Sequence, residues 1–171
     1  MQFTPVVGFF IALAVLTPQP ARAESPELSF QRINVLVAHH DNRFSLRVWP
    51  DGLAEMRFPF YTRQAGLYRW QLESDELTRL RLLFETAAGI DPEHLQSSIA
   101  ERRNQRLVTV ADADLMRLVM ADGRGGVREW VIESPMAWHQ ALPDFDELGA
   151  LARVESELFS WMQARARELQ P

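Results

Sequence analysis

Residues 44–89 read FSLRVWPDGLAEMRFPFYTRQAGLYRWQLESDELTRLRLLFETAAG, and the hydrophobic period changes within this segment. Apolar and polar residues alternate from Phe44 to Trp49 and again from Leu53 to Phe60, which predicts two strands. The turn residues Pro50-Asp51-Gly52 separate them, so we expect a hairpin in which Trp49 pairs with Leu53. A slip of one residue would turn the apolar face to water, so the pattern itself specifies the register.

The alternation resumes after Gly66, with Tyr68, Trp70 and Leu72 on one face, and predicts a third strand. The period then becomes helical. Ser74 is a suitable N-cap, and an apolar stripe runs to Gly89, which is suited to end the helix. The stripe consists of Leu77, Leu80, Leu83, Phe84 and Ala87. We expect this helix to cover the apolar face of the sheet.

The predicted hairpin sorts its residues into an apolar and a polar face. Apolar residues pair on one side, Val48 with Ala54, Leu46 with Met56 and Phe44 with Phe58. On the other side Arg47 lies opposite Glu55. Arg47, Arg57 and Arg69 point outward there and could together meet an anionic partner, although Glu55 would neutralise part of that charge. The tryptophans Trp49 and Trp138 are expected to be exposed, and they indicate a protein contact.

The first 23 residues have the pattern of a secretory signal peptide. An apolar run from Val6 to Leu16 is followed by Ala21-Arg22-Ala23, a small-x-small cleavage site. We expect cleavage after Ala23, a location in the periplasm or outside the cell, and one domain over residues 24–171. The apolar run is too short for a comfortable transmembrane helix, so no stable membrane span is expected after cleavage.

Composition excludes several kinds of chemistry. All 18 basic residues are arginine, so Schiff-base and P-loop lysines are absent. The chain contains no cysteine, which excludes a disulfide framework. The formal net charge is −5 at pH 7, which makes nucleic acid a poor partner. Nothing in the sequence implies a cofactor.

The remaining elements are read from weaker patterns. Residues 24–32 are expected to form a poorly ordered leader, and Ile33 to Val37 a strand. A short helix should begin at Pro92, capped by Asp91. Three further strands are predicted at Leu107 to Val110, Leu115 to Met120 and Val127 to Ile132. The last two are apolar on both faces, so we expect both faces of this hairpin to be covered by other parts of the protein.

A loop carrying Trp138 should precede a long C-terminal helix that is capped by Asp144. Its apolar stripe is interrupted by one carboxylate, Glu155. The stripe runs through Leu148, Leu151, Ala152, Glu155, Leu158, Phe159 and Met162.

Several histidines and aspartates could hold a metal. The candidate ligands are His39, Asp41, Asp112, Asp114 and His139. Their spacing matches no metal-binding motif, and tandem histidines near a turn are usually solvated. The serines form neither a GxSxG elbow nor an SxxK motif, so serine catalysis is not indicated.

The order of these elements resembles that of small secreted bacterial domains whose function is uncharacterised. The residues that carry the resemblance are Leu46 to Gly52, Gly66 to Leu72, Ser74 to Leu83, Asp112 to Gly123 and Pro143 to Trp161. The Cys-Pro that often precedes the first such strand is missing here. The resemblance implies a location in the cell envelope and this layout, and it implies no activity.

The sequence thus predicts an α+β protein with an antiparallel sheet of about six strands packed by two main helices. Our leading hypothesis is a non-enzymatic module that binds an envelope protein or peptide through a sheet face or edge. The alternative is an envelope hydrolase or a metal-dependent enzyme that uses the histidines and aspartates above. A third hypothesis is a homodimer through the doubly apolar second hairpin.

Overall fold

The computed structural model of the protein describes residues 25–106, 110, 114–122 and 125–170. The predicted signal peptide, residues 1–23, lies outside this part of the chain. So do Leu107 to Thr109 of one predicted strand and the candidate metal ligand Asp112.

The described chain forms one six-stranded antiparallel sheet and four helices, which confirms the predicted α+β class. The strands lie in the order β4-β3-β2-β1-β5-β6. They are β1 (Leu28–Ile33), β2 (Arg43–Val48), β3 (Leu53–Phe58), β4 (Gly66–Gln71), β5 (Leu115–Ala121) and β6 (Val127–Glu133). The helices are α1 (Ser74–Ala88), α2 (Pro92–Arg106), α3 (Pro135–Ala141) and α4 (Asp146–Leu169).

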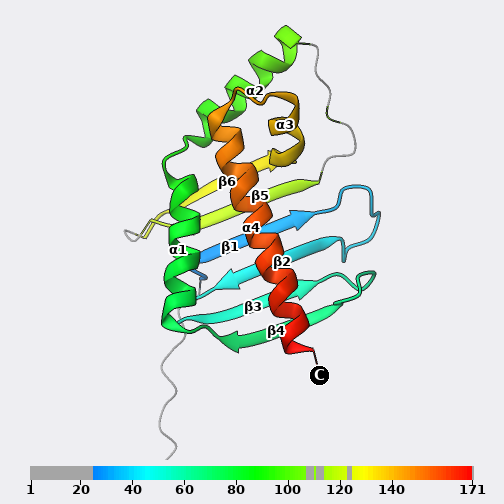
Figure 1. The fold of residues 1–171 in the computed structure, drawn as a ribbon, viewed down its shortest axis with the longest axis vertical. Helices are drawn as coiled ribbons and strands as arrows, with labels where there is room; N and C mark the ends of the chain where they lie inside the picture. Colours follow the sequence, from blue (N-terminus) through cyan, green and yellow to red (C-terminus); the bar gives the residue numbers. More distant parts are fainter. Residues whose placement is uncertain (1–24, 107–109, 111–113, 123–124, 171) are drawn as a thin grey trace, which may run out of the picture.

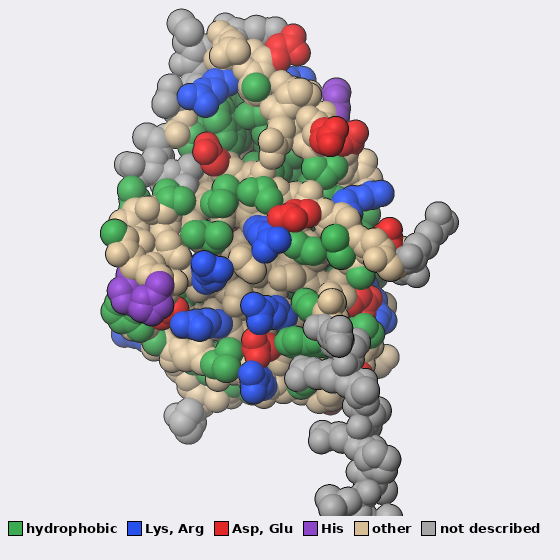
Figure 2. All heavy atoms as spheres, turned by 180° about the vertical axis from the view of Figure 1, so that it is seen from behind, with side chains coloured by type: hydrophobic (Ala, Val, Ile, Leu, Met, Phe, Trp, Pro, Cys, Tyr) green, Lys and Arg blue, Asp and Glu red, His purple; other side chains and the backbone are tan. Residues whose placement is uncertain are grey.

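The two main helices, α1 and α4, cross the same face of the sheet (Figure 1). Between this face and the helices lies one apolar core, which includes Phe30, Leu46, Met56, Phe84 and Leu158. No described helix covers the opposite face, which is open to solvent (Figure 2). None of the helices in the described part of the chain is long and apolar enough to cross a membrane.

The hairpin of β2 and β3 has the predicted register. Val48 pairs with Ala54, Leu46 with Met56 and Arg47 with Glu55, and the Trp49 N–H donates to the Leu53 carbonyl at 2.9 Å. The Phe44 and Phe58 rings meet edge to face, with centroids 5.5 Å apart. The predicted third strand is β4, and it pairs with β3.

The prediction for the N-terminal segment is wrong. Leu28–Ile33 forms β1, a central strand between β2 and β5, although residues 24–32 were expected to be a leader. Leu28 and Phe30 enter the core, while Ser29 and Gln31 are buried on the outer face by the neighbouring strands. The apolar residues Val35 and Leu36, which were placed in a strand, lie in the following loop and are exposed.

Several helix predictions also need correction. Glu73, not Ser74, precedes the first turn of α1, and its N–H donates to the Glu76 carboxylate at 3.2 Å. The segment after Ser134 is helix α3 rather than a loop, and α4 begins at Asp146 after Phe145 rather than at a cap on Asp144.

The second hairpin, β5 and β6, lies at one side of the sheet, and its inner face is the more deeply buried of the two among the described residues. Met116, Leu118 and Trp130 are buried there, whereas Val127 at the start of β6 is exposed. The other apolar residues of the outer face, Leu115, Val119 and Val131, are half-buried, so the expectation that both faces are covered is met only in part. Helix α2, which has 15 residues where a short helix was predicted, lies beside β6, and Gln96 donates to the Val131 carbonyl at 2.8 Å.

Candidate functional site

The open face of the sheet carries arginines from three adjacent strands. Because side chains alternate along a strand, the register sets Arg69, Glu55 and Arg47 in one row across β4, β3 and β2. Arg57 lies in the next row, and Arg43 at the start of β2. Figure 2 shows several basic side chains close together in the lower half of this face. The predicted outward placement of Arg47, Arg57 and Arg69 is confirmed.

Two carboxylates on this face, Glu55 and Asp41, are less exposed than the guanidinium groups that they contact. Glu55 accepts from Arg69 at 2.8 Å and lies 3.5 Å from Arg47. Its side chain is 16% exposed, whereas Arg47 is 48% and Arg69 62% exposed. A molecule that approaches the sheet therefore contacts the arginines first, and Glu55 offsets only part of their charge.

Asp41 has the same relation to Arg57. Its carboxylate accepts from the guanidinium at 2.7 and 3.1 Å and from the Phe60 N–H at 2.9 Å, and these contacts leave it 11% exposed. The hydrogen bond from Phe60, helped by Arg57, lowers the pKa of Asp41. Asp41 is therefore ionised at neutral pH and fixed under Arg57, whose side chain is 49% exposed.

These side chains line a shallow groove of about 320 Å³, which we call the arginine groove. Its lining residues are Gln31, His40, Asp41, Arg43, Ser45, Arg47, Glu55, Arg57, Leu67 and Arg69. Arg43 makes no hydrogen bond or ion pair with the residues that the structure describes, so its charge is fully available. The groove holds four arginines over two covered carboxylates, in a chain of net charge −5.

Two loops at one end of the groove expose an apolar cluster, which we call the apolar tip. It consists of Val35, Leu36, Phe60 and Tyr61, all exposed. The His39 ring bridges the loops, 4.8 Å from the Phe60 ring and 4.0 Å from that of His40. Sequence reasoning missed the tip because it placed Val35 and Leu36 in a strand.

The two tryptophans that were predicted to be exposed are buried. Trp49 is 9% and Trp138 3% exposed. Trp49 is held at the β2–β3 turn, and Trp138 lies on the inward side of α3 because the segment is helical and not a loop. Neither can form the centre of an interface on this surface, so the prediction of exposed tryptophans is wrong.

The candidate metal ligands do not gather in one place. His39 accepts from the Asp41 N–H at 3.0 Å, Asp114 accepts from Arg32 at 2.6 Å, and His139 packs against Gly149. Among the described residues, no three histidine, aspartate or glutamate side chains are placed to hold a metal ion. Asp112 lies outside the described residues.

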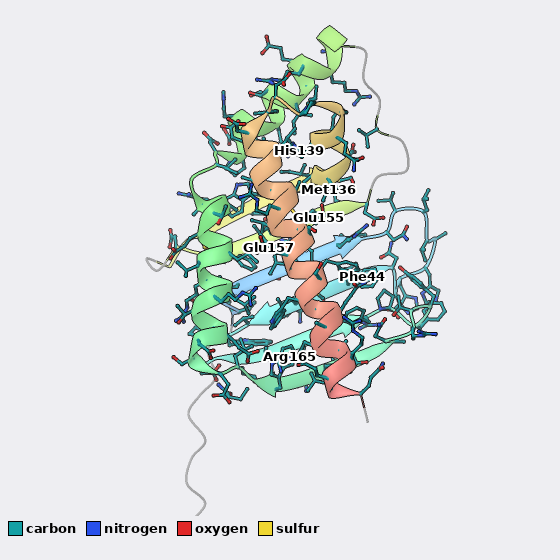
Figure 3. All side chains as sticks on the ribbon, in the orientation of Figure 1. Phe44, Met136, His139, Glu155, Glu157 and Arg165 are labelled. Atoms are coloured by element: carbon teal, nitrogen blue, oxygen red, sulfur yellow. The ribbon has the colours of Figure 1, made fainter. Side chains whose placement is uncertain are left out.

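A second polar cluster, on the helix side of the sheet, surrounds Glu155. Its carboxylate lies 3.9 Å from Arg32 and bonds to the Met136 backbone, and one oxygen, Oε2, has no partner in the described structure. Figure 3 places Glu155 and Met136 where α4 passes α3. Burial raises the pKa of Glu155, and Arg32 opposes that rise. The interruption of the apolar stripe was the sequence signal for this cluster.

The Glu155 cluster ties four parts of the fold together. Arg32 comes from β1, Asp114 precedes β5, Met136 lies in the first turn of α3 and Glu155 lies on α4. The Ser134 N–H also donates to the Asp114 carbonyl at 2.7 Å. An adjacent pocket of about 240 Å³ is lined by serines, Gln140 and Phe159. The contacts are those of a structural junction.

A larger cavity of about 490 Å³ lies between α2 and the second hairpin. Its lining includes Arg103 and Glu133, and Trp138 is the one predicted site residue in it among those that the structure describes. The arginine groove is therefore the place where the largest number of predicted site residues come together: Arg47, Arg57, Arg69 and Asp41.

Fold and site together define an α+β protein whose uncovered antiparallel sheet presents a cationic groove. Comparison with known proteins adds no relative: no protein-family profile matches the chain, and neither a curated protein nor a solved structure is significantly similar to it. The resemblance to secreted bacterial domains stays a prediction, and the function is argued from the groove.

Proposed function

We propose that the protein is a non-enzymatic binding module that takes an acidic, extended segment of another protein into the arginine groove. The predicted signal peptide supports a partner in the cell envelope or outside the cell. The observation that carries the proposal is the layering of charge, since half-exposed guanidiniums lie over carboxylates that are 11% and 16% exposed.

The chemistry of arginine favours carboxylates as the groups that bind here. A guanidinium donates through a planar fork that matches a carboxylate, and an Arg-carboxylate pair is stronger than a neutral hydrogen bond. Arg43 has no hydrogen bond or ion pair to give up among the described residues, and Arg47 and Arg69 share one carboxylate between two cations. A carboxylate of the partner can therefore bind these arginines without displacing a carboxylate that is paired with a single arginine.

The shape of the groove favours an extended chain. Side chains on the same face of a strand repeat every ~6.8 Å, and alternate residues of an extended peptide repeat at the same interval. Carboxylates at every second position of a partner could thus meet successive rows of the sheet. An antiparallel sheet can leave one face open to water, and the groove lies on such a face.

The proposal is tested with a fluorescent peptide in which glutamate alternates with threonine, and binding is followed by anisotropy. We expect Arg43→Ala and Arg69→Ala each to weaken binding by ~10-fold, the loss typical of one charge-assisted contact. Arg43→Ala is the sharper variant because it removes no ion pair seen in the fold.

Arg117→Ala is the matched control. Arg117 lies on the same sheet face but outside the groove, and it donates to Glu129 at 2.6 Å. The two partners are similarly exposed, 43% and 39%, so this pair presents no net charge. Equal losses in the Arg43 and Arg117 variants would show that binding does not depend on the groove, and no binding by the wild type would overturn the proposal.

A further inference from the structure

We propose that the partner segment also carries a bulky apolar residue next to its acidic stretch, and that this residue docks on the apolar tip. The inference rests on the proposed function and specifies the partner more closely. It follows from the exposure of the tip, from the rigidity of its two loops and from its contact with the arginine groove.

The exposure of the tip is unusual because its four apolar side chains come from two loops that meet where the His39 ring contacts the Phe60 ring. Isolated apolar side chains are common on protein surfaces, whereas a contiguous apolar cluster marks an interaction site. Phe60 and Leu36 are 59% and 64% exposed, and Val35 and Tyr61 come from the same two loops. Aromatic side chains supply much of the contact energy in protein interfaces.

Polar contacts beneath the tip fix its loops. The Asn42 side chain donates to the Asn34 carbonyl at 3.1 Å, and the Asn34 N–H donates to the Asn42 carbonyl at 2.8 Å. Asp41 then joins this loop to the next one through the Phe60 N–H. Loops that are ordered in advance lose less entropy when a partner binds, so the exposed apolar side chains are prepared for contact.

The tip and the arginine groove form one continuous surface. His40 and Asp41 line the end of the groove, and the same loop carries Val35 and Leu36. Arg57 and Phe60 both bond to Asp41, so the last arginine and the first aromatic residue share one carboxylate. Figure 2 shows the histidines at one end of the basic side chains, with hydrophobic side chains beside them.

This continuity indicates the chemistry of the occupant. A purely acidic chain would leave the tip in water, and a purely apolar chain would leave the guanidiniums without partners. A segment with alternating carboxylates and an aromatic or large aliphatic residue at one end satisfies both parts. Exposed apolar loops beside arginines also suit an anionic membrane, but the groove hollows the sheet face and the chain as a whole is acidic.

The test compares three peptides by anisotropy: the glutamate-threonine peptide alone and the same peptide with tryptophan at its N-terminal or C-terminal end. We expect one of the tryptophan peptides to bind wild type at least ~10-fold more tightly, as burial of an aromatic side chain allows. In the variants Leu36→Ser and Phe60→Ser that gain should disappear, while the affinity for the plain peptide stays unchanged.

Leu82→Ser is the matched control, because Leu82 is 60% exposed on α1, away from the groove. No binding of any peptide by wild type would overturn the proposed function itself. Binding without a gain from tryptophan would overturn only the present inference. It would also be overturned if the tip variants bound phosphatidylglycerol vesicles less well than wild type but bound all three peptides equally well. The same conclusion would follow if the variants differed from wild type only in their oligomeric state, measured by sedimentation.

Discussion

At the scale of single residues, the depth at which each charged group is buried determines which charges the open sheet face presents. Arg47 and Glu55 form a cross-strand pair that could have been neutral at the surface. Instead Glu55 is covered by two guanidinium groups, and Asp41 by a third. Surface ion pairs contribute little to stability, so this arrangement matters chiefly for what the surface presents to a partner.

Glu155 differs from Glu55 and Asp41, since it is buried and incompletely paired. Burial raises its pKa, so the folded state disfavours the ionised form. The stability of the wild type should then fall as the pH rises above the ordinary value of 4.5 and through the raised pKa. Arg32 keeps its bond to Asp114 when Glu155 is neutralised, which avoids leaving a buried charge alone.

We therefore predict that Glu155→Gln raises the melting temperature at pH 8 by roughly 2–4 °C, the shift that about 1 kcal/mol produces in a chain of this size. The difference should shrink towards pH 4, and thermal unfolding by circular dichroism measures it. Glu157→Gln, an exposed change on the same helix, should have no such effect. A lower melting temperature for Glu155→Gln at pH 8 would mean that the ionised carboxylate stabilises the fold through Arg32.

At the scale of elements, the β2–β3 hairpin could be predicted in full because its local pattern and turn agree. Gly52 has φ +83°. Its carbonyl accepts a hydrogen bond from the Leu72 N–H at 2.9 Å, so the turn is joined to the end of β4. Strand β1 could not be predicted in the same way, since its two buried polar residues, Ser29 and Gln31, depend on neighbours from distant parts of the chain.

The turn gives a prediction at this scale. Gly52→Ala should destabilise the protein by ~1–3 kcal/mol, because alanine disfavours positive φ and its Cβ would lie 2.8 Å from the Gln71 side chain. Gly89→Ala is the control: Gly89 has φ −77°, and no atom would lie within 4 Å of the new Cβ. Urea unfolding measures both. Equal effects of the two changes would contradict the role assigned to this turn.

The candidate site was predictable only in part, and the reason is physical. Strand alternation places Arg47, Arg57 and Arg69 on one face, and that much follows from the sequence. Arg43 joins them, and the apolar tip forms, because the chain from Asn34 to Asn42 is a loop whose ends are hydrogen-bonded to each other and which Asp41 ties to the Phe60 N–H. The burial of Trp138 likewise depends on α3 packing beside α4, a contact that no local pattern encodes.

At the scale of the whole molecule, the two faces of the sheet have different tasks. The helices α1 and α4 bury one face and supply the core, which in a chain without cysteine must stabilise the fold without disulfides. The other face carries no described helix and holds four arginines in a single groove. In the proposed function, the helix-covered face of the sheet stabilises the fold and the open face binds the partner.

The most direct test of this account is a titration of the isotope-labelled protein with the glutamate-threonine peptide, followed by amide chemical shifts. We predict shift changes on β2, β3 and β4, centred on Arg43, Arg47, Arg57 and Arg69, with α1 and the outer side of α4 unchanged. Shift changes centred on the helices, or none at peptide concentrations that saturate other acidic-peptide binders, would contradict the claim that the open sheet face is the binding surface.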